Sequence, residues 1–175
     1  MNQVDWFREK AEKNICTISY SNRSSRFNQA IATFSDLIHD PALALPATVS
    51  TQNESTGHDG VFLVDLGEIS AYVAEWRPTI LRYKKSSKKL PDAEVMNFGI
   101  SKGITRDRTL ILATDPIENW LKTRELLKTD SASGFYVAAT RARFSIAIAV
   151  KKAGKLHSSL HPEFGTNIRL WIAPK

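Results

Sequence analysis

Two arginines close a short apolar segment, and a guanidinium suits phosphate binding because its planar fork matches the phosphate oxygens. The segment Gly134 to Arg143 is predicted to form a short helix packed on nearly all sides, followed by a buried strand at residues 144–150. Residues two apart on an ideal helix are separated by about 200°, so Arg141 and Arg143 would leave on opposite faces. One would stay solvated beside the last carbonyl groups, where a cation is favoured. The other would project toward a carboxylate or a phosphate, and the residue types alone leave both partners open.

The sequence of this segment decides which partner we expect. Residues 136–143 read Tyr-Val-Ala-Ala-Thr-Arg-Ala-Arg, which resembles motif VI of the UvrD/Rep-like superfamily I DNA helicases over a long and specific stretch. The resemblance implies that Arg141, the arginine after the threonine, contacts the γ-phosphate of ATP bound on the other motor domain.

A second arginine belongs to a stretch that resembles motif IV of the same family. Residues 19–25 read Ser-Tyr-Ser-Asn-Arg-Ser-Ser, where the family has an Asn-Tyr-Arg-Ser-like turn after a strand. Asn22 directly precedes Arg23, so the tyrosine of that turn is missing, although Tyr20 is close by. The resemblance implies that Arg23 is a second γ-phosphate contact. Without it, Arg23 would be a surface arginine at a helix start, where a cation is disfavoured.

A third stretch, residues 97–107, resembles motif V, which in the family reads roughly Thr-x-His-x-x-Lys-Gly-Leu-Glu-Phe-Asp. Lys102, Gly103 and Asp107 match, and Arg106 stands for the phenylalanine. Gly99 stands for the histidine, which removes one implied DNA contact.

The two halves of motif V have different implied roles. The first half would contact the backbone of single-stranded DNA through Asn97, Ser101 and Lys102. The second half would bind the ATP ribose near Gly103 and Thr105. Thr105 stands for the family's glutamate, so it could hydrogen-bond a ribose hydroxyl only as a neutral partner.

The chain lacks the loop that would hold the phosphates of its own nucleotide. A Walker A loop needs Gly-x-x-x-x-Gly-Lys-Ser/Thr, and neither that pattern nor a strand ending in paired acids occurs in the sequence. We therefore expect the isolated chain to be inactive, with ATP and Mg²⁺ held mainly by a separate Walker-containing motor domain. The alternative is a free-standing, degenerate helicase-like module that binds nucleic acid or a protein without catalysis. An unrelated α/β domain with chance motifs is a third interpretation.

The elements that would position these residues alternate along the chain. The periodicity predicts helices at residues 4–13 and 68–76, a helix starting at Asp115, and a helix that Ser24 or Ser25 caps and Pro41 ends. Strands are predicted at residues 16–20, 61–64, 94–98, 109–114, 144–150 and 168–173. Strands that alternate with helices, several of them continuously apolar, indicate an α/β sheet covered on both faces. The resemblance implies a RecA-like, mostly parallel sheet with helices on both faces, as one domain over residues 1–175.

Two polar segments interrupt this pattern. Residues 41–60 are predicted to form a mobile loop. Residues 82–89 hold the densest basic run, which is either a solvated loop or a contact with a nucleic-acid backbone. Trp120 lies on the apolar side of its predicted helix and is assigned to packing.

Composition and charge add weaker limits. The 175 residues carry a formal net charge of +6 and a pI near 9.5, which favours contact with polyanions. The single cysteine, Cys16, excludes an intramolecular disulfide, and the scattered histidines predict no metal site. No signal peptide and no membrane span is predicted, so we expect a cytoplasmic protein without membrane contact.

Overall fold

The computed structural model describes residues 3–17, 21–84 and 90–174. Its main feature is a six-stranded sheet in the order β5-β4-β6-β7-β3-β8, with every pair of neighbouring strands parallel. These strands are β3 (Gly60–Asp65), β4 (Thr79–Arg82), β5 (Val95–Asn97), β6 (Arg106–Leu112), β7 (Ala142–Val150) and β8 (Ile168–Leu170). A separate two-stranded parallel pair consists of β1 (Arg23–Ser24) and β2 (Val49–Ser50).

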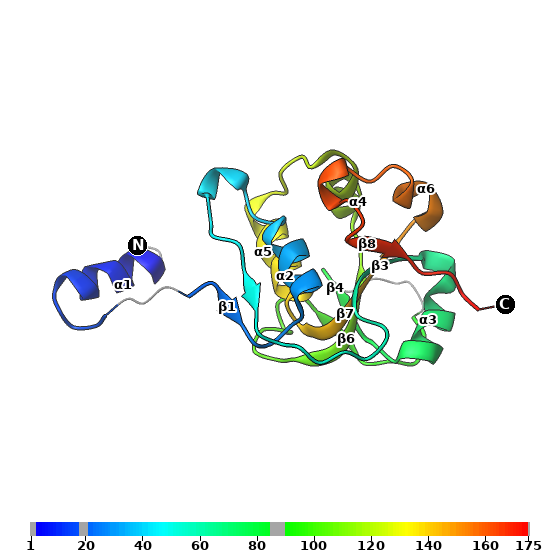
Figure 1. The fold of residues 1–175 in the computed structure, drawn as a ribbon, viewed down its shortest axis with the longest axis horizontal. Coiled ribbons are helices and arrows are strands. Elements are labelled where there is room, and N and C mark those ends of the chain that lie inside the picture. The colour runs from blue at the N-terminus through cyan, green and yellow to red at the C-terminus, as the bar shows by residue number, and fades with distance from the viewer. Residues whose placement is uncertain (1–2, 18–20, 85–89, 175) are drawn as a thin grey trace.

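Helices cover both faces of the sheet because its central strands are apolar on both sides. In β3, Val61 and Leu63 face one core while Phe62 and Val64 face the other, as the two-residue period of a strand requires. One face is covered by α2 (Gln29–Asp36), α4 (Asp115–Thr123), α5 (Thr129–Ala139) and α6 (Ala153–His157), and the other by α3 (Ile69–Trp76) (Figure 1). The predicted fold class, an α/β fold with a mostly parallel sheet covered by helices on both faces, is confirmed.

The larger core is centred on Trp120, which is 1% exposed. Its ring meets Phe34, Phe135 and Phe164 edge-on, with centroids 5.9, 5.6 and 4.9 Å away, an arrangement that aromatic pairs prefer. These rings come from α2, α5 and the 3₁₀ turn η3 (Pro162–Phe164). The assignment of Trp120 to packing is therefore confirmed.

Helix α1 (Gln3–Glu12) stands apart from the sheet in Figure 1. It matches the helix predicted at residues 4–13. The strand predicted at residues 16–20 falls partly outside the described residues, and Cys16 and Thr17 are not in a strand. Tyr20 and Ser19 of the motif IV stretch also lie outside the described residues.

The helix predicted to start at Asp115 does begin there, whereas the predicted cap of α2 is wrong. Asn28, not Ser24 or Ser25, caps α2, because its side-chain oxygen accepts a hydrogen bond from the Ile31 amide at 3.0 Å. Pro41 does not end this helix but opens the 3₁₀ turn η1 (Pro41–Leu43). The cap residue of α4 is Thr114.

The helix predicted at residues 134–143 is also corrected. Helix α5 begins at Thr129 and ends at Ala139, and Ala142 already pairs with Arg106 in the sheet. Arg143 therefore lies on a strand, and the two arginines do not share a helix.

The structure also contains short elements that the sequence did not predict. Strand β4 was not expected, since only three residues lie between Pro78 and the basic run at residues 82–89. Residues 41–60 contain η1 and β2, and their mobility stays a prediction. Part of the basic run, residues 85–89, lies outside the described residues. No helix in the described ranges is long and apolar enough to cross a membrane.

Candidate functional site

Arg141 lies in the turn between α5 and β7, at the amino-terminal edge of the sheet. Its backbone carbonyl accepts a hydrogen bond from the Arg106 amide at 2.8 Å, where β6 begins, and its own amide donates to the Ala138 carbonyl at 3.3 Å. The residue is thus fixed to the end of a helix on one side and to the start of a neighbouring strand on the other.

The guanidinium of Arg141 is held almost entirely by uncharged oxygens. Its Nε donates to the Val137 carbonyl at 2.9 Å, and one terminal nitrogen donates to the Ser101 and Ile104 carbonyls at 3.4 and 3.3 Å. The other terminal nitrogen donates to the Thr140 hydroxyl at 3.1 Å. The residue is 8% exposed. A guanidinium has five N–H donors, so these four bonds leave donor capacity for one further acceptor.

No carboxylate neutralises this buried cation within the described ranges, where Arg141 forms no salt bridge. Burial and the nearby positive charge of Arg26 lower the pKa of Arg141, while Tyr136 opposes them. Buried charges are normally paired. The ion pair considered as one partner for this arginine is absent from the described structure, and an unneutralised positive charge remains near the surface.

A neighbouring positive charge acts on Arg141, and it belongs to Arg26. The second phosphate contact implied by the resemblance was Arg23. Arg23 is exposed on β1, which among the described strands pairs with β2 alone. Arg26 is also exposed, and its charge acts on both Arg141 and Tyr136. Two hydrogen bonds of Asn28 explain this position: its side-chain amide donates to the Phe144 carbonyl at 2.7 Å, and its backbone N–H donates to the Arg143 carbonyl at 3.1 Å.

The loop between β5 and β6 runs from the carboxyl end of β5 back to the amino end of β6. Asn97, at the carboxyl end of β5, accepts a hydrogen bond from the Arg82 guanidinium at 3.1 Å. Lys102 is exposed, whereas Ser101 is fully buried and its hydroxyl donates to the Phe98 carbonyl at 2.7 Å. The Ser101 side chain therefore stabilises the loop. It does not face solvent, as a contact with single-stranded DNA would require.

The second half of this loop comes close to Arg141. Gly103 has φ +82°, a left-handed conformation that favours glycine, and no atom would obstruct a side chain there. Thr105 is exposed, and its carbonyl accepts a hydrogen bond from Arg106 at 3.1 Å. The structure thus joins Arg141 to this loop through the Ser101 and Ile104 carbonyls. Ser101 also lies in one turn with Asn97, whose carbonyl accepts a hydrogen bond from the Ser101 amide at 3.2 Å.

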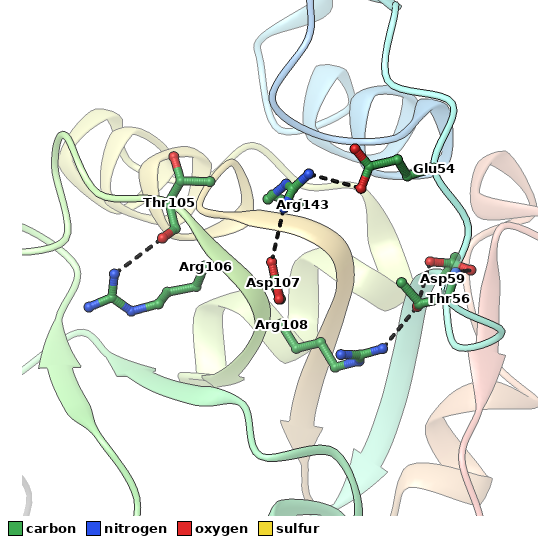
Figure 2. Close-up of polar contacts among 8 residues, drawn as sticks. All are labelled: Glu54, Thr56, Asp59, Thr105, Arg106, Asp107, Arg108 and Arg143. Carbon is green, nitrogen blue, oxygen red and sulfur yellow. Dashed lines mark hydrogen bonds and ion pairs between the residues drawn. The ribbon is translucent and has the colours of Figure 1, made fainter.

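Arg143 belongs to a surface network of ion pairs. Figure 2 shows its guanidinium between Glu54 and Asp107, at 3.0 and 3.4 Å. The side chain is 37% exposed, so each ion pair contributes little, about 0–1 kcal/mol. The second arginine of the segment is consequently the solvated and paired one.

The loop before β3 supplies Glu54 and is shaped by its own hydrogen bonds. Burial alone would raise the pKa of Asp59, but hydrogen bonds from Thr56, Ser55 and Gly57 to its carboxylate lower it overall. The Thr56 hydroxyl in turn accepts a hydrogen bond from Arg108 at 2.9 Å, as seen in Figure 2. These bonds bring the loop against the starts of β6 and β7.

A further carboxylate at this edge is firmly paired. Glu94 accepts two hydrogen bonds from Arg106, at 2.7 and 2.8 Å, and one from Thr79 at 2.7 Å. These bonds, those from Arg106 foremost, lower the pKa of Glu94 to about 2. Arg106 is thereby occupied and is not available as another phosphate contact.

Sequence reasoning missed Arg26, Glu54 and the Glu94–Arg106 pair. Arg26 had a usable signal, because it follows Arg23 by three residues in the segment that leads into the same helix. Glu54 lies 89 residues before Arg143 in the chain, and no local pattern connects the two.

Comparisons with known proteins give a general likeness. No protein-family model and no curated protein matches the sequence. The C-terminal domain of a possible DNA helicase from Lactobacillus plantarum WCFS1 is 14% identical at a TM-score of 0.46, over 84% of this chain and 98% of that one. The PRRSV helicase is 17% identical at a TM-score of 0.46, over 85% of this chain and only 26% of its own.

Proposed function

We propose that this chain is the second, C-terminal motor domain of an ATP-dependent DNA helicase of the UvrD/Rep type. In this role Arg141 faces the γ-phosphate of ATP that a separate Walker-containing motor domain holds, in the same or another chain. The observation that carries the proposal is the state of Arg141: a buried cation, held in place by uncharged acceptors, with no carboxylate partner among the described residues.

Such an arrangement suits phosphoryl transfer. That reaction depends on positioning and on neutralising charge, and an arginine supplied by a second domain contributes roughly 10³–10⁵ in rate. The carbonyls of Val137, Ser101 and Ile104 hold the guanidinium before a nucleotide arrives. A preorganised donor stabilises developing charge without reorganising during the reaction.

The other residues of this edge fit the nucleotide only in part. Arg26 or Arg23 would add a second positive charge, and the exposed Thr105 beside Gly103 could hydrogen-bond a ribose hydroxyl. The described residues contain no group of three or more metal-ligating side chains, so the ligands for Mg²⁺ would come from the Walker-containing domain. Bound ATP with Mg²⁺ supplies the phosphoryl group to be hydrolysed.

The loop at residues 97–105 gives a physical route between nucleotide and DNA. Its carbonyls at Ser101 and Ile104 bind Arg141, and Asn97 and the exposed Lys102 lie in its first half. A shift of Arg141 toward a phosphate would therefore pull on the segment proposed to contact single-stranded DNA. This connection would make strand binding depend on whether the two motor domains are closed on ATP.

The test is ATP hydrolysis by the helicase that joins this domain to its Walker-containing partner domain. Arg141→Ala should lower kcat by roughly 10³ or more and leave ATP affinity nearly unchanged. Arg143→Ala is the matched control, since its side chain is solvated and paired with Glu54 and Asp107. Equal losses in kcat and ATP affinity, or no loss in either, would contradict a trans-acting role for Arg141.

Arg26→Ala and Arg23→Ala should be compared in the same assay. The electrostatic contact with Arg141 favours Arg26, so its replacement should lower kcat more than that of Arg23. An effect confined to Arg23 would support the contact implied by the family resemblance.

The second candidate function is a degenerate helicase-like module that binds nucleic acid or a protein without catalysis. The glycine at position 99 and the threonine at position 105, where the family has histidine and glutamate, favour it. Strand binding that is unaffected by ATP in the joined protein would support this candidate. A cytoplasmic location is part of either proposal.

A further inference from the structure

An exposed tyrosine stands beside the turn that carries Asn97. Tyr83 directly follows β4 and is 45% exposed. Strands β4 and β5 are parallel neighbours, and Arg82 lies opposite Asn97 in the register. Because both strands end at this edge of the sheet, Tyr83 and the start of the loop at residues 97–105 share one surface.

The ring of Tyr83 lies against Phe98 and near helix α5. Phe98, only 2% exposed, meets it edge-on at 76° with the ring centroids 6.1 Å apart. Gly134 of α5 lies beside both rings, since a Cβ atom there would be in ordinary van der Waals contact, 3.9 Å from the Tyr83 ring and 3.4 Å from that of Phe98. A ring held in this way loses little freedom when it binds a partner.

The surroundings of Tyr83 are cationic. Lys84 directly follows Tyr83 and is exposed, and the half-buried Arg82 donates to the Asn97 side chain at 3.1 Å. The exposed Lys102 follows the turn in which the Ser101 amide donates to the Asn97 carbonyl at 3.2 Å. Within the described ranges none of these three cations forms a salt bridge. An exposed, supported aromatic ring among unpaired cations is the combination that single-stranded nucleic acid recognises, with bases on the ring and phosphates on the cations.

We propose that Tyr83 is a base-stacking residue for single-stranded nucleic acid, and that it forms a binding platform with Lys84, Asn97 and Lys102. The inference rests on the proposed function and extends it, because it assigns a residue outside the three helicase-like motifs. The ring supplies binding that does not depend on base identity, since every base has a flat face. The cations supply binding that depends on salt.

The experiment measures binding of a fluorescently labelled oligothymidine of roughly 12 nucleotides to the chain, by fluorescence anisotropy at low salt. Tyr83→Ala should weaken binding by roughly 5- to 150-fold, the equivalent of about 1–3 kcal/mol per stacked base. Tyr83→Phe keeps the ring and should bind within about two-fold of wild type.

Salt separates the ring from the cations. Tyr83→Ala should leave the slope of log K against log salt unchanged, because it removes no charge. Lys102→Ala should reduce that slope by about 0.7 for one lost phosphate contact.

A strand with abasic positions tests stacking without any variant. Wild type should bind the abasic strand about as weakly as Tyr83→Ala binds the normal one, and the substitution should then have no further effect. An equal loss on both strands, no loss on either, or a loss in Tyr83→Phe as large as in Tyr83→Ala would overturn the inference. A wild-type chain with no affinity for the oligonucleotide would overturn it as well, whether or not the surface binds a protein.

Failure of this platform is distinguishable from failure of the motor function. Strand binding is measured without nucleotide and without the Walker-containing domain, whereas the role of Arg141 is measured as turnover. A chain that binds strands through Tyr83 but does not need Arg141 for turnover would keep the platform and lose the proposed function.

Discussion

Acidification should destabilise the domain through His58, which is 5% exposed. Its ring is stacked between Phe62 and Trp76, with ring centroids 4.0 and 3.8 Å away, and its Nε2 lies 2.9 Å from the Tyr72 hydroxyl. The imidazole is held uncharged because burial removes the water that would solvate a charge and because Arg108 and Arg169 lie near it. Protonation of His58 must therefore oppose folding.

The magnitude follows from the pKa. Burial, and then the positive charges of Arg108 and Arg169, lower the pKa of His58 from 6.5 to about 4, while Asp59 opposes the shift. Between these two values the unfolded chain binds a proton that the folded chain does not, so stability falls as the pH falls through 6.5 toward 4. At about pH 5 this proton lowers the ratio of folded to unfolded chains roughly 30-fold, which corresponds to a loss of about 2 kcal/mol in unfolding free energy relative to neutral pH.

The assay is urea unfolding of wild type and His58→Gln, from about pH 7.5 down to about pH 5. Glutamine does not titrate, but it can still hydrogen-bond the Tyr72 hydroxyl. Without the stacked ring the variant is less stable overall. Because it lacks the titrating group, its unfolding free energy should fall by about 2 kcal/mol less than that of wild type over this range. Parallel pH dependences in the two proteins would refute the account of His58. A wild type whose stability rises on acidification would refute its sign.

Three further outcomes are expected. The isolated chain should show no DNA-stimulated ATP hydrolysis in a phosphate-release assay, and robust turnover would mean that a nucleotide site lies within the chain itself. Gly103→Ala should destabilise the domain in urea unfolding by about 1 kcal/mol because of its left-handed backbone, and a stabilised variant would contradict that conformation. Glu54→Gln should cost less than about 1 kcal/mol in the same assay, since its partner Arg143 is 37% exposed; a larger cost would show that the loop before β3 depends on this pair.

Several elements could be predicted from the sequence because local patterns specify them. The apolar runs that became β3, β6 and β7 can be stable only when buried on both faces, so they indicated a parallel sheet covered by helices. The spacing of apolar residues gave the buried face of α2, and the position of Trp120 among apolar neighbours gave its role in the core. The resemblance of residues 136–143 to motif VI singled out Arg141, whose role as a phosphate contact stays a prediction.

The environment of each arginine was decided by tertiary structure. Pairing of Ala142 with Arg106 ends α5 early, and this places Arg143 on a strand in solvent and Arg141 under the loop at residues 97–105. The anchoring of Asn28 to the start of β7 brings Arg26 near Arg141. Both effects come from contacts between segments far apart in the chain, which no periodicity records.

By itself, then, the sequence determined the parallel α/β class, the main buried strands and the residues capable of phosphate or nucleic-acid chemistry, because burial and side-chain type are local properties. Only the tertiary structure decided that Ser101 is buried, that Arg143 pairs with Glu54 and that Tyr83 stands on Phe98 beside Asn97. These arrangements depend on which strand ends share an edge of the sheet, and that is set by the packing of the whole domain.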